Sequence, residues 1–383
     1  MKIKVKPEDF IVKELIDLPL ARRGPYTILS LEKKYWNTLD VIDFVARKLS
    51  VPKRLFSRAG LKDRYSWSTQ YLSFEGDFKH AIKETNFELA PIGRAWRPIL
   101  PDLLQGNHFI VTLRSLEPGE GKRITNNYEA IKDFGLPNYF DEQRFGSARH
   151  RKGFFAKEMM LEHYRGALRL LLCYPYKEDN RKEKTFKNFC HENWGNWQAC
   201  LDLAPPIYKR IIHHLTTQPK DFKNAIKTID RELLNIYVLA YQSFLFNIML
   251  SLFVAKYGVD NIQTPYSMGQ FVFYRRIRDF SKLKSTPLPM LNEKFRIDAA
   301  NSEFVEQVLE KEKIKLKDFA LRKMRLRGVR FKHFLRPAIV SPKNLMLGKL
   351  EDDEIYPTKK KMRIEFVLPP GSYATLLIKR LLI

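Results

Sequence analysis

MRIEFVLPPGS, the stretch from Met362 to Ser372, alternates apolar with mostly charged side chains and then ends on two prolines, a glycine and a serine. The alternation repeats every two residues, which is the period of a strand with one well-buried face. Four apolar side chains fall on that face: Met362, Ile364, Phe366 and Leu368. Ser372 can then cap a short helix through residues 376–378, so the chain is expected to finish on regular structure.

Outward from this stretch, the spacing of apolar residues changes along the chain. Strand-like runs lie in the first third, at 10–12, 26–31 and 108–114. Asn37 can cap a helix whose apolar stripe continues to Leu49. Further on the spacing becomes helical, which predicts a helix at 158–172 and a longer one at about 229–254. The chain therefore combines a strand-rich part with a helix-rich middle.

The charge balance indicates a polyanionic partner. Lys and Arg number 68 and Asp and Glu number 43, which gives a net charge of +25 over 383 residues. Such an excess raises the local concentration of polyanions, so nucleic acid is the leading partner class. An anionic membrane surface, or the lysine content of a thermophilic or very soluble protein, is the alternative explanation. The length predicts two or three folding units.

Cysteine use and the N-terminus bear on location. Cys173, Cys190 and Cys200 form no C-x-x-C pair, so neither a disulfide framework nor a thiolate zinc site is expected. The residues after Met1 alternate charged and apolar side chains, without the apolar core of a signal peptide. Apolar runs are broken by charges before they could span a bilayer. We therefore expect a soluble, cytoplasmic protein with no membrane partner.

The segment AGLKD, residues 59–63, places a lone carboxylate on a turn for which Gly60 supplies backbone freedom. Lys62 and Arg64 flank Asp63, and cations that close would keep it ionised. An ionised aspartate can act as a nucleophile, a general base or a metal ligand, and the flanking cations argue against a metal. By spacing alone, a surface turn with a solvated ion pair is the commoner explanation.

A second segment, NYFDEQRFG at 138–146, combines aromatic side chains with amides and an arginine. Aromatic faces can stack on an unpaired base while Asn138 or Gln143 hydrogen-bonds to its edge. Four cations in or after this segment can hold phosphates: Arg144, Arg149, Arg151 and Lys152. The alternative is a half-buried strand whose aromatic side chains belong to the core.

Other patterns carry less chemistry. Residues 240–247 are expected on a core-packed helix with Gln242 and Asn247 on different faces. Residues 366–375 are typical of an ordinary strand-to-helix turn. The sequence has no Gly-rich phosphate loop, no H-E-x-x-H and no G-x-S-x-G motif. Its histidines and cysteines lack partners at ligand spacing, so no metal site is expected.

In their order along the chain, these segments resemble the TruD family of pseudouridine synthases, which isomerise uridine in tRNA and other RNAs. PEDF at 7–10 precedes AGLKD at 59–63, NYF and QRFG lie within 138–146, and LPPGSYAT at 368–375 closes the series. GNHF at 106–109 also matches a family segment. Four matches in the right order make the resemblance specific over most of the chain, whereas the helical middle matches only loosely.

The resemblance implies roles for individual residues. The family's aspartate nucleophile falls on Asp63, and its stacking phenylalanine and neighbouring asparagine fall on Phe140 and Asn138. Lys4, by its distance before the PEDF segment, matches a basic residue that the family sets near the aspartate. Asp141 stands where the family usually has glycine, and it brings negative charge near the implied RNA path. The other substrate-binding candidates are Lys62, Arg64, Gln143 and Arg144.

The fold implied by the resemblance is α+β. A pseudouridine synthase catalytic domain with a bent mixed β-sheet would comprise residues 1–160 and 335–383. It would be interrupted by an inserted helix-rich α+β domain at about 161–334. The basic run 322–330 would either line an RNA cleft or form a solvated helix face.

The implied activity is the isomerisation of one uridine, at position 13 of the tRNA D arm as in the family, by a monomeric enzyme. The reaction breaks the glycosidic bond, turns the base and rejoins it through carbon, so no cofactor and no metal are expected. Base flipping comes first, because the glycosidic bond is inaccessible in a stacked helix. Asp63 would attack the sugar or the base, or take a proton from the ribose, and the sequence leaves these routes open.

Two other functions remain open at this point. A non-catalytic tRNA-binding chaperone of the same fold would refold tRNA whether or not Asp63 is present. A metal-dependent nuclease using Asp63, Asp141 and Glu142 would need a divalent ion, and Lys62 and Arg64 crowd that carboxylate.

Overall fold

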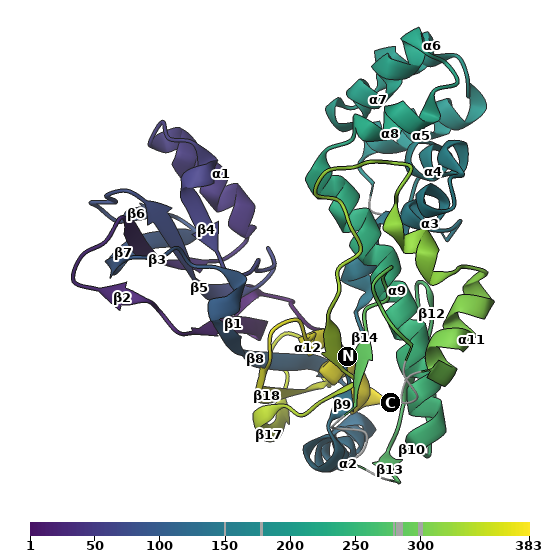
Figure 1. The fold of residues 1–383 in the computed structure, drawn as a ribbon. Helices are drawn as coiled ribbons and strands as arrows, with labels where there is room; N and C mark the ends of the chain where they lie inside the picture. Colours follow the sequence, from purple (N-terminus) through teal and green to yellow (C-terminus); the bar gives the residue numbers. More distant parts are fainter. Residues whose placement is uncertain (149–150, 177–178, 279, 281–285, 298–301) are drawn as a thin grey trace. The chain divides into compact units, whose positions relative to one another are not determined.

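A computed structural model describes residues 1–148, 151–176, 179–278, 280, 286–297 and 302–383. The chain forms two compact units, and each is described by itself (Figure 1). Unit 1 comprises Met1–Leu136 and Val340–Ile383, and unit 2 comprises Pro137–Ile339. This division falls at other residues than the boundaries expected at 160 and 335, and the assignment of a catalytic and an inserted domain stays a prediction.

Unit 1 is built on a ten-stranded mixed sheet. The strands follow the order β17-β18-β8-β1-β5-β3-β7-β2, with β4 paired to β5 and β6 paired to β7. β1 and β5 run parallel, whereas β8 runs antiparallel to both β1 and β18. The strand bounds are Phe10–Ile16 (β1), Leu20–Ala21 (β2), Tyr26–Lys33 (β3), Phe56–Arg58 (β4), Trp67–Glu75 (β5), Ile82–Glu84 (β6), Phe87–Ala95 (β7), Leu104–Leu116 (β8), Lys343–Asp352 (β17) and Lys360–Leu368 (β18).

The long strand β8 joins the two ends of the chain. Val111 lies opposite Phe10 of β1 on one side and opposite Ile364 of β18 on the other. The strand predicted at 362–368 is confirmed, because its four alternating apolar side chains are buried. The last helix begins at Ala374 with Tyr373 at the N-cap position, so the cap predicted at Ser372 is wrong.

Three helices accompany the sheet: Thr38–Lys48 (α1), Pro118–Phe134 (α2) and Ala374–Leu382 (α12). α1 begins after Asn37 as predicted, and its Val41 and Val45 share one buried cluster with Leu31 and Leu72 of the sheet. Burial of such aliphatic side chains stabilises the unit by about 1.5–3 kcal/mol each. The bent mixed sheet with packed helices confirms the predicted α+β class.

Unit 2 is rich in helices. Their bounds are Phe155–Met160 (α3), Tyr164–Leu172 (α4), Arg181–Glu192 (α5), Trp197–Leu203 (α6), Pro206–Thr217 (α7), Phe222–Lys227 (α8), Arg231–Tyr257 (α9) and Ser302–Glu312 (α11). The single helix predicted at 158–172 is wrong, because the chain breaks between α3 and α4, where Glu162 takes a left-handed φ of 67°.

Short two-stranded ladders complete unit 2. They pair Gly258–Val259 (β10) with Arg276–Ile277 (β13), Ile262–Tyr266 (β11) with Gly269–Phe273 (β12), and Pro287–Pro289 (β14) with Leu335–Pro337 (β15). Leu136–Pro137 (β9) pairs with Ile339–Val340 (β16) where the chain passes from one unit to the other.

The helix α9 forms the core of unit 2 and confirms the long helix predicted from about residue 229. By length and composition alone, this helix could cross a membrane, yet 67% of its apolar window is buried inside the protein. Its buried residues lie on every face, from Leu234 to Val254. A helix that is apolar all round is typical of the centre of a globular unit.

A buried arginine ties together distant segments of unit 1. Arg114 of β8 is 3% exposed, and its guanidinium donates to Asp9 at 2.7 Å and to Asp353 at 2.8 Å. A third ion pair joins it to Glu354 at 2.8 Å. Burial would raise the pKa of Asp353, but backbone amides and Arg114 outweigh this effect and lower it. The cluster ties the N-terminal segment to the connection between β17 and β18.

Replacing Arg114 by methionine should leave two buried carboxylates without their cation. We expect the free energy of unfolding to fall by about 3–5 kcal/mol at neutral pH, as for other broken buried ion pairs. A carboxyl with a lowered pKa stabilises the fold above its unfolded pKa of roughly 4, and this contribution is lost as the pH falls. The two proteins should therefore differ in their free energy of unfolding in urea by the full amount at pH 7 and by less below pH 4. A difference in unfolding free energy that does not depend on pH contradicts the stabilising role of this cluster.

Candidate functional site

Asp63 lies in the loop of residues 59–66, which joins the antiparallel neighbours β4 and β5. Its side chain is 48% exposed, so the carboxylate is accessible to a substrate. Gly60 does not use a left-handed backbone, and an added Cβ would meet its nearest neighbours at 3.6–3.9 Å, an ordinary contact distance. The expected need for glycine's conformational freedom in this loop is therefore wrong.

Two lysines from other segments hold Asp63. Lys4 Nζ donates to Asp63 Oδ2 at 2.8 Å, and Lys33 Nζ, at the end of β3, donates to the Asp63 carbonyl oxygen at 2.9 Å. Ser66 Oγ donates to the same carbonyl oxygen at 2.9 Å. Lys4 adopts a left-handed φ of 55°, and its ammonium lies 4.3 Å from the centre of the Phe10 ring. The carboxylate thus pairs with a cation whose own backbone is strained.

The side chain of Lys62 turns into unit 1. Its Nζ donates to Glu14 Oε1 at 2.5 Å, and the two side chains are 7% and 0% exposed. Glu14 Oε2 also accepts from the backbone N–H of Tyr71 at 3.0 Å. A buried, hydrogen-bonded ion pair therefore ties the Asp63 loop to β1 and β5. The substrate-binding role of Lys62 stays a prediction, although its ammonium is buried against Glu14.

The start of α1 provides a second anchor for the same loop. The backbone N–H of Lys62 donates to Thr38 Oγ1 at 3.0 Å, and Thr38 Oγ1 donates to Gln70 Oε1 at 2.7 Å. Gln70 Nε2 in turn donates to the carbonyl oxygen of Gly60 at 3.4 Å. Thr38 and Gln70 are both buried. The loop conformation is therefore set from both ends by side chains of regular elements.

The cation that pairs with Asp63 comes from far away in the sequence. Lys4 lies 59 residues before it, while Lys62 binds Glu14 and Arg64 Nε donates to the carbonyl oxygen of Tyr35 at 3.1 Å. From the residues alone, the sequence neighbours Lys62 and Arg64 were expected to supply the charge beside Asp63, whereas the family resemblance implied Lys4. In an irregular loop, adjacent side chains leave the backbone in different directions, so adjacency in sequence does not predict which groups meet.

Lys33 is a buried base beside the site, with 1% of its surface exposed. Burial lowers the pKa of Lys33 to about 8, and the charge of Lys62 acts in the same direction, while that of Asp63 opposes it. Lysine is the residue whose pKa shifts most readily on burial. The positive charge behind the Asp63 carbonyl therefore titrates in the mildly alkaline range.

Replacing Lys33 by methionine should change how stability depends on pH. Between pH 8 and the unfolded lysine pKa of about 10, the unfolded chain binds more protons at Lys33 than the folded chain does. The wild-type protein therefore gains stability as the pH rises through this window. We expect the wild-type free energy of unfolding, relative to that of Lys33→Met, to increase by about 1–3 kcal/mol from pH 7 to pH 10. A constant or falling difference in urea unfolding contradicts a buried charge at Lys33.

In unit 2, Asn138 is fixed by Arg336 of β15. Arg336 Nη2 donates to Asn138 Oδ1 at 2.7 Å, and its Nε donates to the Asn138 carbonyl oxygen at 3.0 Å. Asn138 Nδ2 donates to the carbonyl oxygen of Pro337 at 3.1 Å. Asn138 and Arg336 are 5% and 6% exposed. The amide is therefore held in one orientation by a buried guanidinium.

Phe140 is clamped by α9 and covered by the same arginine. Asn247 Oδ1 accepts from the Phe140 backbone N–H at 2.8 Å, and its Nδ2 donates to the Phe140 carbonyl oxygen at 2.9 Å. The Arg336 guanidinium carbon lies 4.2 Å from the ring centre, and Phe246 meets the ring edge-on at 5.5 Å. Phe140 is 4% exposed. Stacking on a base would therefore require the neighbours of this ring to move.

The segment after Phe140 forms the 3-10 helix Glu142–Ala148. Gln143 is exposed, and the Arg144 guanidinium carbon lies 5.6 Å from the Phe140 ring centre. Asp141 is buried and its φ is not left-handed, so the position where the family usually has glycine demands no glycine geometry in this chain. Arg149, one of the cations expected to hold phosphate, lies outside the described residues.

Several contributors to these sites were missed from the sequence, although a signal existed. Glu14 continues the buried face of β1 that begins with Phe10 and Val12, and Lys33 ends the buried face of β3 after Leu31. A charged residue at a core position of a period-two pattern needs a partner. Gln242 and Asn247 of α9 are likewise polar residues at core positions, because they interrupt an otherwise apolar helix.

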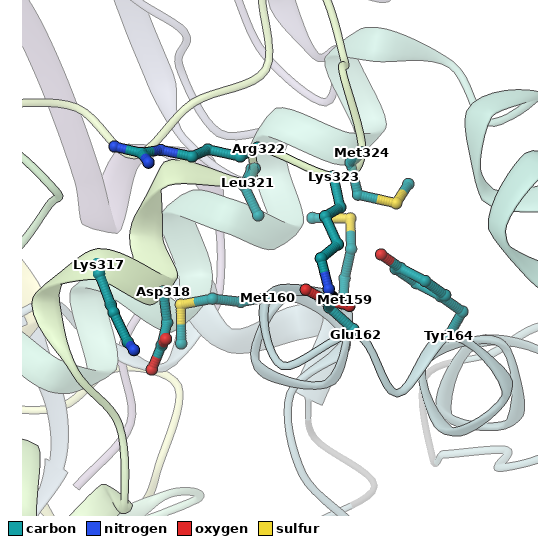
Figure 2. A pocket seen from close by; sticks show the side chains of 10 residues that line it. All are labelled: Met159, Met160, Glu162, Tyr164, Lys317, Asp318, Leu321, Arg322, Lys323 and Met324. Carbon is teal, nitrogen blue, oxygen red and sulfur yellow. Dashed lines mark hydrogen bonds and ion pairs between the residues drawn. The ribbon is translucent and has the colours of Figure 1, made fainter.

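A separate cavity of about 320 Å³ lies in unit 2, beside α3 and the start of α4 (Figure 2). Lys323 pairs with Glu162 at 2.8 Å, and the hydroxyl of Tyr164 also lines the cavity. Two of its lining residues, Arg322 and Lys323, belong to the basic run 322–330, which the sequence offered as a possible RNA contact. The basic run 322–330 follows the 3-10 helix Leu316–Ala320 and forms turns, so the expected helix face is wrong.

Comparisons with known proteins identify the family. A family model described as TruD, tRNA pseudouridine synthase D, matches residues 1–381. A Methanococcus maripaludis protein named probable tRNA pseudouridine synthase D 1 is 33% identical over 391 residues, covering 99% of each chain. The Aquifex aeolicus tRNA pseudouridine synthase D is 28% identical over 393 residues, covering 100% of this chain and 98% of its own.

A solved structure assigned to tRNA pseudouridine synthase D (TruD) from Methanosarcina mazei matches with a TM-score of 0.72 and 23% identity. The match covers 99% of this chain and 93% of that one, and it shows that the two share a fold. The α+β fold with its bent mixed sheet therefore places the chain in the class of pseudouridine synthase folds. The chain belongs to the TruD family, tRNA pseudouridine synthase D, as its sequence segments indicated.

Proposed function

We propose that the protein isomerises one uridine of tRNA to pseudouridine, at position 13 of the D arm, with Asp63 as the catalytic carboxylate. The observation that carries the proposal is the Asp63 loop. Its carboxylate is 48% exposed, pairs with Lys4 at 2.8 Å, and stands on a backbone held by Lys33 and the buried Lys62–Glu14 pair. Preorganised charge of this kind is what a catalytic group needs.

The reaction conserves every atom of the nucleotide. The bond between the ribose C1′ and N1 of uracil breaks, a bond between C1′ and C5 forms, the proton on C5 leaves, and N1 gains a proton. No electron acceptor and no external group take part. Asp63 would act on the ribose or the base, either as nucleophile or by accepting a proton, and Lys4 would stabilise the negative charge of the carboxylate.

The remaining site residues are proposed to handle the base and the RNA backbone. Phe140 would stack on a base once the neighbours of its ring, Arg336 among them, move aside, and Asn138 would then hydrogen-bond to the edge of that base. Gln143 and Arg144 lie on the same segment, where they would extend the RNA contact. The net charge of +25 supports binding of the surrounding tRNA phosphates.

The two alternative functions gain no specific support. Among the residues that the structure describes, no three His, Cys, Asp or Glu side chains gather as metal ligands. Asp63 is paired with a lysine, which disfavours a divalent ion beside it. A tRNA chaperone without catalysis would give no reason for an exposed carboxylate that pairs with Lys4 on a loop anchored by buried side chains.

Replacing Asp63 by asparagine tests the proposal directly. We expect pseudouridine formation in tRNA transcripts to fall at least roughly 1,000-fold, because a proton or bond transfer loses its carboxylate, while the dissociation constant for tRNA changes less than about threefold. Mass spectrometry of digested RNA measures the product, and filter binding measures affinity. Asp77→Asn, which removes a carboxylate that is 64% exposed elsewhere in unit 1, is the matched control. Retained isomerisation by Asp63→Asn contradicts the proposal, and mapping the modified uridine tests position 13.

A further inference from the structure

Two exposed tyrosines lie close to Asp63, one within its loop and one after the end of β3. Tyr65 is 59% exposed and follows Asp63 by two residues, while Tyr35 is 46% exposed and follows Lys33 by two residues. Lys33 itself binds the Asp63 carbonyl oxygen, so both tyrosines start from backbone next to the anchored carboxylate. Large aromatic side chains left this exposed are uncommon, and neighbouring ones are typical of a binding surface.

Arg64 joins the two tyrosines. Its Nε donates to the carbonyl oxygen of Tyr35 at 3.1 Å, and its guanidinium carbon lies 5.8 Å from the centre of the Tyr65 ring. Among the residues that the structure describes, no carboxylate forms an ion pair with Arg64. The guanidinium is therefore held in place by a single backbone contact and a ring, and it keeps donors for an external anion.

Tyr35 is held in a strained conformation. Its φ is 58°, in the left-handed region, which costs a residue with a bulky side chain about 1–3 kcal/mol. The carbonyl oxygen of that same residue accepts the hydrogen bond from Arg64 Nε. Strain of this kind persists where the surroundings maintain a particular geometry, and it gathers at functional sites. Lys4, the partner of Asp63, has the same kind of backbone strain with a φ of 55°.

We propose that Tyr35, Arg64 and Tyr65, the tyrosine–arginine rim, bind the unpaired nucleotides next to the target uridine. The proposal rests on the function proposed above, since it assumes that Asp63 acts on a flipped uridine. Removing that base from its stack leaves its neighbours unstacked, and unpaired bases bind to aromatic rings and guanidinium planes. Tyr65 and Tyr35 supply the rings, and Arg64 between them supplies a cation for the connecting phosphate.

A protein partner fits the same surface less well. The rim offers one cation and two amphipathic rings beside a catalytic carboxylate, in a chain with a net charge of +25. Stacking on an aromatic ring tolerates any base, so the rim would add affinity near the target without fixing its sequence. The inferred ligand is therefore single-stranded RNA flanking the reactive uridine.

The test measures RNA binding in a protein that cannot turn over. In the Asp63→Asn background, Tyr65→Ala should raise the dissociation constant for a tRNA transcript by roughly 5- to 100-fold, the range for losing one stacked base. Tyr65→Phe should stay within about twofold, because the ring face remains. Arg64→Gln should lower the slope of log affinity against log salt by about 0.7–0.9, equivalent to one phosphate contact. Trp96→Ala removes another exposed aromatic of unit 1, 64% exposed, as the matched control.

A second measurement locates the stacked base. An abasic nucleotide beside the target uridine should weaken RNA binding by the Asp63→Asn protein that keeps Tyr65. It should cause no further loss of affinity in the protein that also carries Tyr65→Ala, as in a double-mutant cycle. The proposed role of the tyrosine–arginine rim would be contradicted by equal RNA affinities of Tyr65→Ala, Tyr65→Phe and Trp96→Ala, with thermal unfolding unchanged. The proposal would also be contradicted if the abasic nucleotide reduced RNA affinity equally in all three variants. Because binding is measured without turnover, these outcomes are separate from any failure of Asp63 as the catalytic group.

Discussion

The buried ion pair between Lys62 and Glu14 is the constraint on which the candidate site depends. It crosses from the loop of residues 59–66 to β1, and Glu14 also holds the backbone of β5. Breaking such a pair by removing one partner typically costs about 3–5 kcal/mol, because the other charge is left buried. The exposed carboxylate of Asp63 therefore stands next to a rigid anchor, which lets an irregular loop hold the proposed catalytic group in a fixed position.

Different side chains hold the backbone and the carboxylate of Asp63. Buried residues of the sheet set the backbone, as Lys33 and Gln70 do, and Lys4 contacts the carboxylate itself in an ion pair. In unit 2 a comparable arrangement holds Asn138 and Phe140, where Arg336 and Asn247 bind their backbone and side-chain groups. In both units, polar groups buried in the core determine the conformation of the candidate site residues.

Much of the fold could be predicted from the sequence, because regular elements follow from local periodicity. The alternation at 362–368 gave the strand that lies beside β8, and apolar spacing gave α1 and α9. The break between α3 and α4 could not be predicted, since it depends on the left-handed backbone of Glu162. The family could be recognised because its segments are short and ordered. Lys4 was expected near Asp63 only from the family resemblance. The anchors Lys33 and Glu14 could not be predicted, because strand pairing brings them to this loop from distant parts of the sequence.

The central claim is that Glu14 and Lys62 act at a distance by positioning Asp63. The most direct test compares Glu14→Gln with Asp179→Asn, which disrupts a similarly buried pair with Lys187 in unit 2. Both variants should lose stability, but only Glu14→Gln should lower the single-turnover rate of isomerisation, by at least about tenfold, with tRNA affinity within about twofold of wild type. A wild-type rate for Glu14→Gln, measured well below its unfolding temperature, would contradict the account.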